Sequence, residues 1–221
     1  MSSNPTPQDT PKTHAAPNVF CSHSVTLSVP IKDVYKTLGT TAGHERVCRL
    51  SKLCSKFELH QQDIVAVPPD TKRMADGVRI RELEPEQAGV ESGNRQEITR
   101  HHFLMEETLP FLFGAYKKVV TLKGTLSWND AEAKRLNDKG QEFDVAAASK
   151  DGRFEALYET VSGEGIVVWK HRRFEVVEGE PGKTKVSERL EIAAPSWMKP
   201  IVQWQADKGH KAHMDQYHTL F

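Results

Sequence analysis

The stretch KTKVSERLEIAAPSWMKPIVQWQADKGHKAHMDQYHTLF (183–221) decides the fold, because it predicts a strand followed by a long helix. Apolar and polar residues alternate from Val186 to Ile192, which is typical of a strand with one buried face. From residue 198 onward, inward-facing positions recur at intervals of three and four, which is the spacing of a helical face. The predicted inward stripe of this helix is Met198, Ile201, Val202, Gln205, Gly209, His213, Gln216, Tyr217 and Leu220.

Further strands are predicted on the N-terminal side of this stretch, at residues 57–67, 95–107, 116–128, 154–161 and 166–177. Residues 129–152 between two of them form a long polar insert, which we expect to be an exposed hairpin loop. Residues 68–94 are rich in Pro, Asp, Glu and Gly and predict mainly loop, with a short strand possible at Val78 and Ile80.

The N-terminal part begins with a strand in which Val25, Leu27 and Val29 alternate with polar residues, until Pro30 ends it. Residues 31–39 then show helical spacing, and a second short helix is predicted over 43–53. Residues 1–18 hold four prolines and almost nothing apolar, so we expect a disordered tail and a single domain over 19–221.

Strands joined by tight turns form an antiparallel sheet, and the apolar face of that sheet must be covered. Only the last helix is long enough to do so. The sequence therefore predicts an α+β fold, in which a curved antiparallel sheet of about seven strands wraps a long C-terminal helix. Two short helices follow the first strand.

Composition excludes several classes of function. The 221 residues contain 30 Lys+Arg and 30 Asp+Glu, so there is no net charge to favour a nucleic-acid partner. No apolar run reaches the roughly 18 residues that span a bilayer. We see no secretory signal, and three cysteines are too few for a disulfide framework, so a reduced cytoplasmic protein is expected.

No cofactor or metal is predicted. The chain has no phosphate-binding glycine loop and no nucleophile elbow. His210 and His213 are three residues apart and could share an ion, but His210 is expected to point away from the inward stripe. No acidic or cysteine ligand is placed with them.

Both ends of the domain resemble one family. The opening SVTLSVPIKDVYKTL (24–38) and the ending GKTKVSERLEI (182–192) with PIVQWQADKGHKAHMDQYHTLF (200–221) resemble the SRPBCC (START-like) superfamily, including its birch-pollen-allergen and polyketide-cyclase branches and, best, its fungal members. The resemblance covers about residues 20–221 in element order. It implies a deep, mostly apolar cavity between sheet and helix, which binds lipids, sterols, hormones or polyketides and in some members catalyses cyclisation, dehydration or condensation.

The middle of the predicted helical stripe is polar, which allows two interpretations. Gly209 costs about 1 kcal/mol in a helix interior, and buried Gln205 and His213 need hydrogen-bond partners. These residues, with Tyr217, fit a helix that lines a ligand cavity. Alternatively, Gly209 accommodates a close-packed strand and His213 bonds a backbone carbonyl.

Glu188 lies on the apolar face of its strand, where a carboxylate needs a partner. If EGEPG (178–182) is a five-residue turn, Val177 lies opposite Lys183 and Arg172 lies opposite Glu188. The two charged residues then form either a buried pair that orients a polar substrate group or a fixed structural salt bridge.

The preceding hairpin leaves its register open. With a two-residue turn at 163–164, Trp169 lies opposite Tyr158, and a slip of one residue reverses the two faces. Tyr158 is therefore a candidate ligand contact, not an assigned one. His101 and His102 are adjacent, so one of them points inward and could act as an acid or base; His102 is our candidate.

Two functions compete. In the first, the protein is an enzyme of specialised metabolism, with Glu188, Arg172 and His213 as catalytic groups acting by cyclisation, dehydration or a related rearrangement on a polyketide- or terpenoid-like intermediate. In the second, it is a carrier that binds a hydrophobic small molecule without chemistry. Gln205, Gly209, Tyr217, Tyr158 and His102 are the predicted ligand contacts. A monomer or a homodimer is expected.

Overall fold

The computed structural model describes residues 16–68, 79–85, 95–111, 116–137 and 144–221 of the chain. Most of the predicted tail, residues 1–15, lies outside this part. Asn18 belongs to the folded domain, because its side chain donates to the Ala194 carbonyl at 2.8 Å and accepts from the Ala194 amide at 3.2 Å.

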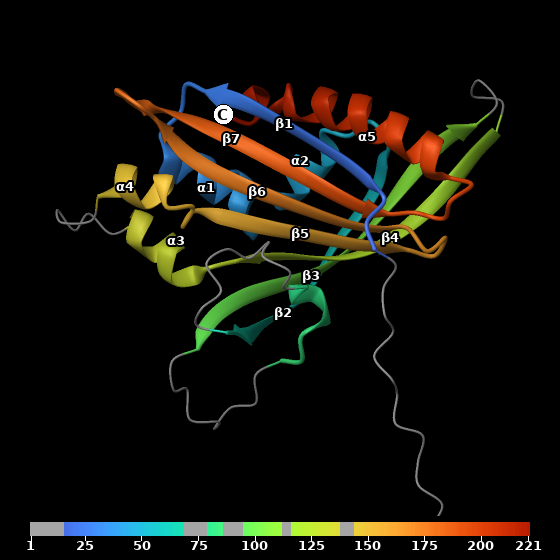
Figure 1. Ribbon diagram of the computed structural model, residues 1–221, viewed down its shortest axis with the longest axis horizontal. Coiled ribbons are helices and arrows are strands. Elements are labelled where there is room, and N and C mark those ends of the chain that lie inside the picture. Colours follow the sequence, from blue (N-terminus) through green and yellow to red (C-terminus); the bar gives the residue numbers. More distant parts are fainter. Residues whose placement is uncertain (1–15, 69–78, 86–94, 112–115, 138–143) are drawn as a thin grey trace, which may run out of the picture.

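The described strands form a single antiparallel sheet in the order β1-β7-β6-β5-β4-β3-β2 (Figure 1). This confirms the predicted α+β helix-grip class. The strands are β1 (Val19–Leu27), β2 (Cys54–Val67), β3 (Gln96–Phe111), β4 (Tyr116–Trp128), β5 (Glu155–Ser162), β6 (Val167–Val177) and β7 (Glu180–Ala193).

Helices follow the first strand, link β4 to β5 and end the chain. They are α1 (Ile31–Gly39), α2 (His44–Arg49), α3 (Asp130–Asn137), α4 (Val145–Lys150) and α5 (Lys199–Met214), with 3-10 turns at Thr41–Gly43, Ile80–Glu82 and Tyr217–Leu220. The predicted helix over 31–39 is confirmed, and its buried side chains include the four expected from the spacing: Ile31, Val34, Tyr35 and Leu38.

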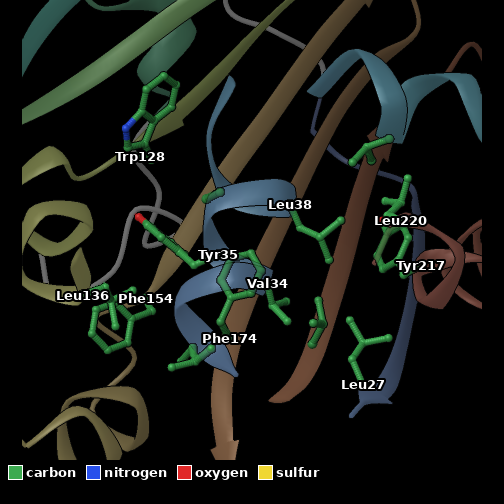
Figure 2. Close-up of a cluster of buried hydrophobic side chains, with 14 of the residues drawn as sticks. Leu27, Val34, Tyr35, Leu38, Trp128, Leu136, Phe154, Phe174, Tyr217 and Leu220 are labelled. Atoms are coloured by element: carbon green, nitrogen blue, oxygen red, sulfur yellow. The ribbon is translucent and has the colours of Figure 1, made fainter. Parts of the chain in front are cut away.

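The main core lies between α1 and one face of the sheet, which we call the inner face. Tyr35 of α1 contacts Phe154 and Phe174 edge to face, with ring centroids 5.9 and 5.1 Å apart (Figure 2). Tyr217, in the last 3-10 turn, belongs to the same cluster. The first helix and the C-terminus therefore pack on the same part of the sheet.

The insert at 129–152 is not the exposed loop that we predicted, because it contains α3 and α4. Leu136 and Ala148 on these helices are buried in the main core. Both helices begin at a capping side chain: Asn129 Oδ1 accepts from the amide of Ala131 at 2.9 Å, and Asp144 Oδ1 accepts from that of Ala147 at 3.0 Å. Such caps stabilise a helix end by about 1 kcal/mol.

Helix α5 is rotated relative to the predicted stripe. Its buried residues are Ala206, His210 and Met214, whereas Ile201 is 54% exposed and Gln205 and Gly209 are exposed as well. The helix runs along β1, at the edge of the sheet (Figure 1). The predicted inward face of the helix was wrong, because His210 points inward and not outward. Its ring bonds the buried carboxylate of Glu188 on β7.

The position of Gly209 makes a testable prediction. A Cβ atom there would have only Gln205 Oε1 within 4 Å, at 3.9 Å. Gly209→Ala should therefore stabilise the protein by about 1 kcal/mol, the helix-propensity difference. Gly124→Ala is the opposing control, because its Cβ would lie 2.8 Å from the Glu159 carbonyl oxygen. Urea unfolding measures both, and a destabilised Gly209→Ala variant would show an unseen packing contact.

The outer face of the sheet carries a short strap, residues 79–83. Ile80 lies in a 3-10 turn and not in the strand considered for it; it is buried with Val65, Ile98 and Leu157. Val78 lies outside the described residues. The strap therefore closes a second, smaller core on the outer face.

Glu159 holds this strap from beneath. Its Oε2 accepts from the Arg81 amide at 2.7 Å, while Oε1 is buried without a hydrogen-bond partner. Burial raises the pKa of Glu159 from 4.5 to about 7, against the opposing effect of the Arg81 amide bond.

Stability should therefore depend on pH through Glu159. A raised carboxyl pKa means that the folded state holds the proton more tightly, so its contribution is complete below pH 4.5 and is lost as the pH rises through about 7. Glu159→Gln should remove most of the fall in unfolding free energy between about pH 5 and about pH 8. Urea unfolding across this range checks it, with the exposed Glu58→Gln as control. An unchanged pH slope in Glu159→Gln would contradict it.

Candidate functional site

A buried ion pair joins β6 and β7 on the inner face of the sheet. Arg172 on β6 lies opposite Glu188 on β7, as the sequence predicted, and Arg172 Nε donates to Glu188 Oε1 at 2.5 Å. The predicted neighbours Phe174–Val186 and Val168–Ile192 are also paired. Arg172 is 5% exposed and Glu188 is 2% exposed, so water screens the pair very little.

Two further side chains complete a network around Glu188. Tyr217 donates its hydroxyl to Glu188 Oε1 at 2.6 Å and accepts from Arg172 Nη2 at 2.7 Å. His210 Nε2 lies 2.9 Å from Glu188 Oε2, and Arg172 Nη1 also donates to the Leu38 carbonyl. The network ties β6, β7, α1, α5 and the C-terminal turn together.

Electrostatics in this network favour the charged forms. Burial alone would raise the pKa of Glu188, but the charges of Arg172 and Lys170 and the bond from His210 hold it well below its usual value. Burial lowers the pKa of Arg172, and the charge of Glu188 overcomes this and raises it. Arg172 and Glu188 therefore stay charged, and each has its partners within the protein.

Lys170 is a second cation on the same inner face, two residues before Arg172. It lies opposite Tyr158 on β5 and Leu190 on β7. Its Nζ is 4.4 Å from the centroid of the Tyr158 ring and 3.9 Å from Glu188 Oε2. Its side chain is 14% exposed, and burial lowers its pKa against the charge of Glu188.

Glu107 on β3 is an acidic group whose pKa is shifted in the direction opposite to that of Lys170. Burial raises its pKa, and the charge of Lys170 opposes that rise. Glu107 shares the inner face with Met105, which lies opposite Leu122 of β4. Lys170, Tyr158, Glu107 and Leu122 are all half-buried, and we call them the inner patch.

Apolar and aromatic side chains border the inner patch. Cys48, Phe57, Phe103 and Met105 form a buried cluster on which Leu122 and Tyr158 pack. His44 lies inside this cluster and is 4% exposed. Neither of its ring nitrogens has a hydrogen-bond partner among the described residues, and its ring centroid is 4.7 Å from that of Phe103. Burial holds the pKa of His44 well below 6.5, so this imidazole is neutral.

The predicted ligand residues on the last helix have mixed positions. His213 Nε2 donates to the Val47 carbonyl at 2.8 Å, and burial lowers its pKa to about 4. His213 therefore bonds a backbone carbonyl, which was the second of the two interpretations of this residue. Gly209 and Gln205 lie four and eight residues before it, hence on the same face of α5, and no strand among the described residues packs against Gly209. The close-packed-strand interpretation of Gly209 was wrong.

His102 does not point inward. It lies on the outer face, where its Nε2 is 3.3 Å from Asp63 Oδ2. His101 takes the inner face, together with Phe103. Since neighbours on a strand point to opposite faces, the choice between the two histidines depended on the unknown register.

Both hairpin turns differ from the predicted ones. Tyr158 lies opposite Lys170, and Trp169 opposite Glu159, so the one-residue slip places Tyr158 on the inner face. The other hairpin turns at 178–179, with Gly179 at φ 75°, and Val177 lies opposite Glu180, not opposite Lys183. A register shift between Val176 and Val177 restores the Arg172–Glu188 pairing.

Two hollows lie on the outer face of the described part of the chain. One, of about 490 Å³, is lined by Ser22, Ser24, His171, Arg173 and neighbouring residues; the other, of about 290 Å³, is lined by His60, Arg81, His102, Lys123 and neighbouring residues. Neither is the apolar cavity that the resemblance implied. The inner patch is instead a half-buried part of the inner face.

The described residues also lack two features, a metal-ligand cluster and a membrane-spanning helix. No three His, Cys, Asp or Glu side chains come together there as possible metal ligands. No helix in the same part of the chain is long and apolar enough to cross a membrane.

No protein-family model and no curated protein matches the chain. Solved structures do resemble it. ZhuI aromatase/cyclase from Streptomyces sp. R1128 has 9% identity and a TM-score of 0.48, covering 90% of this chain and 91% of its own. A START superfamily protein from Mycobacterium smegmatis has 9% identity and a TM-score of 0.46, covering 92% and 100%. Ara h 8.0201 has 11% identity and a TM-score of 0.41, covering 90% and 97%.

One of these structures is an aromatase/cyclase and another is a START superfamily protein, names that also occur in the SRPBCC (START-like) family that the sequence resembles.

Proposed function

We propose that the inner patch binds a hydrophobic small molecule and that Lys170 and Glu107 act on it as acid and base. One observation carries the proposal. A lysine with a lowered pKa and a glutamate with a raised pKa interact on the same apolar face. Groups whose surroundings shift their pKa values toward neutrality are typical of sites that transfer protons.

The composition of the neighbourhood supports the binding of an apolar molecule. Ligand sites in proteins combine mostly apolar and aromatic walls with a few polar groups that fix orientation. Phe57, Phe103 and Met105 supply such a wall, and Lys170 and Glu107 supply the polar groups. Gln205 and Gly209 on α5 remain proposed ligand contacts.

The chemistry would suit a polyketide- or terpenoid-like intermediate of specialised metabolism. The Lys170 ammonium would donate a hydrogen bond to a carbonyl oxygen and stabilise negative charge developing there. The Glu107 carboxylate would remove a proton from the adjacent carbon, or its acid form would protonate a leaving hydroxyl. Cyclisation and dehydration both consist of such steps.

The residues first chosen as catalytic receive different proposed roles. Arg172 and Glu188 are satisfied by each other and by Tyr217 and His210, so we assign them to positioning Lys170. His213 is held by the Val47 carbonyl, which fits an anchor between α5 and α2.

A carrier without chemistry is the second candidate. The satisfied network around Glu188 favours it, because none of its members offers a free group to a ligand. The two candidates separate when an offered ligand is recovered after incubation and its mass and isomeric form are determined. A carrier returns it unchanged, whereas the enzyme returns a product whose formation Lys170→Met and Glu107→Gln abolish.

We also propose that the protein works in a reducing compartment, the cytoplasm, as a monomer or homodimer. Cys21, Cys48 and Cys54 are all free thiols, which fits such a compartment. The absence of net charge fits a small-molecule partner better than a nucleic acid, which would favour a basic protein.

Binding can be tested with an apolar fluorophore whose emission rises on leaving water. We expect about one bound probe per native chain, displaced by a fatty acid or a sterol. Leu122→Asp should weaken binding about tenfold or more, since it places a carboxylate on the inner patch. Lys123→Asp is the matched control, because the next residue along β4 points to the outer face. Equal effects of the two variants would contradict binding at the inner patch.

A further inference from the structure

We infer that the molecule bound at the inner patch carries a carboxylate and that Lys170 pairs with it. The inference rests on the proposed function and names the class of ligand: a hydrophobic body with a single negatively charged oxygen head.

The first step is the unused hydrogen-bonding capacity of Lys170. Glu188 Oε1 already accepts from Arg172 and Tyr217, and Oε2 is bonded by His210. Lys170 Nζ is 3.9 Å from Oε2, which is beyond hydrogen-bond distance. Within the described part of the chain, no acceptor bonds its three N–H groups. An ammonium group that is 14% exposed and lacks acceptors is poorly satisfied unless a ligand or water supplies one.

The second step is the charge around it. Arg172 and Glu188 neutralise each other at 2.5 Å, so Lys170 adds a positive charge that the network does not balance. The Tyr158 ring at 4.4 Å compensates only in part, because a cation–π contact is weaker than a charge-assisted hydrogen bond in an apolar site.

The third step concerns the other titratable groups that interact with Lys170. Glu107 is the remaining acid, and burial favours its neutral form, which can donate a hydrogen bond to a carboxylate. His213 is shifted toward its neutral form, and Cys48 is a buried thiol with its pKa raised to about 12. One unbalanced cation beside a neutral acid fits one negative charge. A doubly charged phosphate would leave one of its two negative charges without a cation in this largely buried site.

The experiment compares ligands that differ only in the head. Decanoic acid is paired with decanol, and 2-naphthoic acid with 2-naphthylmethanol, so that linear and cyclic bodies are distinguished. Affinities are measured at neutral pH by displacement of the apolar fluorophore. We expect each acid to bind the wild-type protein about tenfold more tightly than its alcohol, the effect of one charge-assisted hydrogen bond.

Variants then locate the preference. Lys170→Met should remove it by weakening the acids about tenfold while leaving the alcohols unchanged, and Lys170→Arg should retain it. Glu107→Gln should retain the preference, because the glutamine amide, like the neutral acid, can donate a hydrogen bond to the carboxylate. Lys123→Met, on the outer face, should change nothing.

Each result decides the matter. Alcohols that bind as well as acids in the wild-type protein, or a preference that survives in a folded Lys170→Met variant, would overturn the assignment of the carboxylate while leaving the binding site in place. Failure of all four compounds and of the fluorophore to bind would overturn the proposed function itself. The wild-type comparison requires no variant to fold.

Discussion

Glu188→Ala is expected to lower the free energy of unfolding by about 3–5 kcal/mol, the usual effect of removing one partner of a buried ion pair. The substitution would leave the Arg172 guanidinium buried at 5% exposure and without its carboxylate. Tyr217 and His210 would each lose a hydrogen-bond partner as well. Few other single changes would disturb four elements of the fold at once.

Double substitution tests the coupling. Arg172→Met combined with Glu188→Leu should cost clearly less than the sum of the two single changes, because no uncompensated charge of the pair remains. Glu58→Ala is the control: its bond to Lys56 is exposed, and such pairs contribute about 0–1 kcal/mol. Urea unfolding measures the free energy of unfolding of the two single variants, of the double variant and of Glu58→Ala. A Glu188→Ala variant as stable as Glu58→Ala would show that the network is not formed.

Arg100→Met should have an effect of similar size on the outer face, about 3–5 kcal/mol. Arg100 is 3% exposed and donates to both carboxylate oxygens of Asp63, at 2.8 and 2.7 Å. Its Nη1 also donates to the carbonyls of Ile80 at 2.8 Å and Leu83 at 2.7 Å. Removing the guanidinium would take from Asp63 its two shortest hydrogen bonds and from the Ile80 and Leu83 carbonyls one donor each.

Hydrogen exchange separates a local effect from a global one. Release of the strap should first raise the exchange rates of two amides. The Arg81 amide donates to the Glu159 carboxylate, and the Leu83 amide donates to the Ile80 carbonyl. Arg189→Met is the control, since the Arg189 side chain is 57% exposed. If the Arg81 and Leu83 amides keep their protection in Arg100→Met, the strap is held by Ile80 and its apolar neighbours alone.

Much of the fold follows from patterns within single segments. The helix at 31–39 has a proline before it, an apolar stripe and a terminal glycine, so local sequence suffices. The Arg172–Glu188 pairing was predicted from an assumed five-residue turn, and that register matches charge with charge and apolar with apolar along the ladder. The turn beside it was nevertheless wrong, since a bulge near Val177 compensates for a shorter turn.

Features that depend on distant segments could not be predicted in the same way. The phase of α5 depends on whether His210 or His213 faces the sheet, and this is decided by Glu188 on β7, which needs the bond from His210.

The helices in the insert do carry a local signal, because Asn129 followed by Glu132 is a typical helix start.

Two charged residues of the inner patch, Lys170 and Glu107, were missed for different reasons. Lys170 could have been found, because it lies two residues before Arg172 and therefore on the same face of β6. Glu107 could not, since it becomes a neighbour of Lys170 only through the order of the strands between β3 and β6.

The central claim is that a hydrophobic small molecule binds at the inner patch. Amide chemical shifts of the isotopically labelled protein, followed during titration with decanoic acid, test it most directly. We predict saturable shifts at about one ligand per chain, largest at Lys170, Tyr158 and Glu107 on the strands and at Gly209 on α5. Shifts centred instead on His60, Arg81 and Lys123 around the outer hollow, or no saturable shifts at all, would contradict the claim.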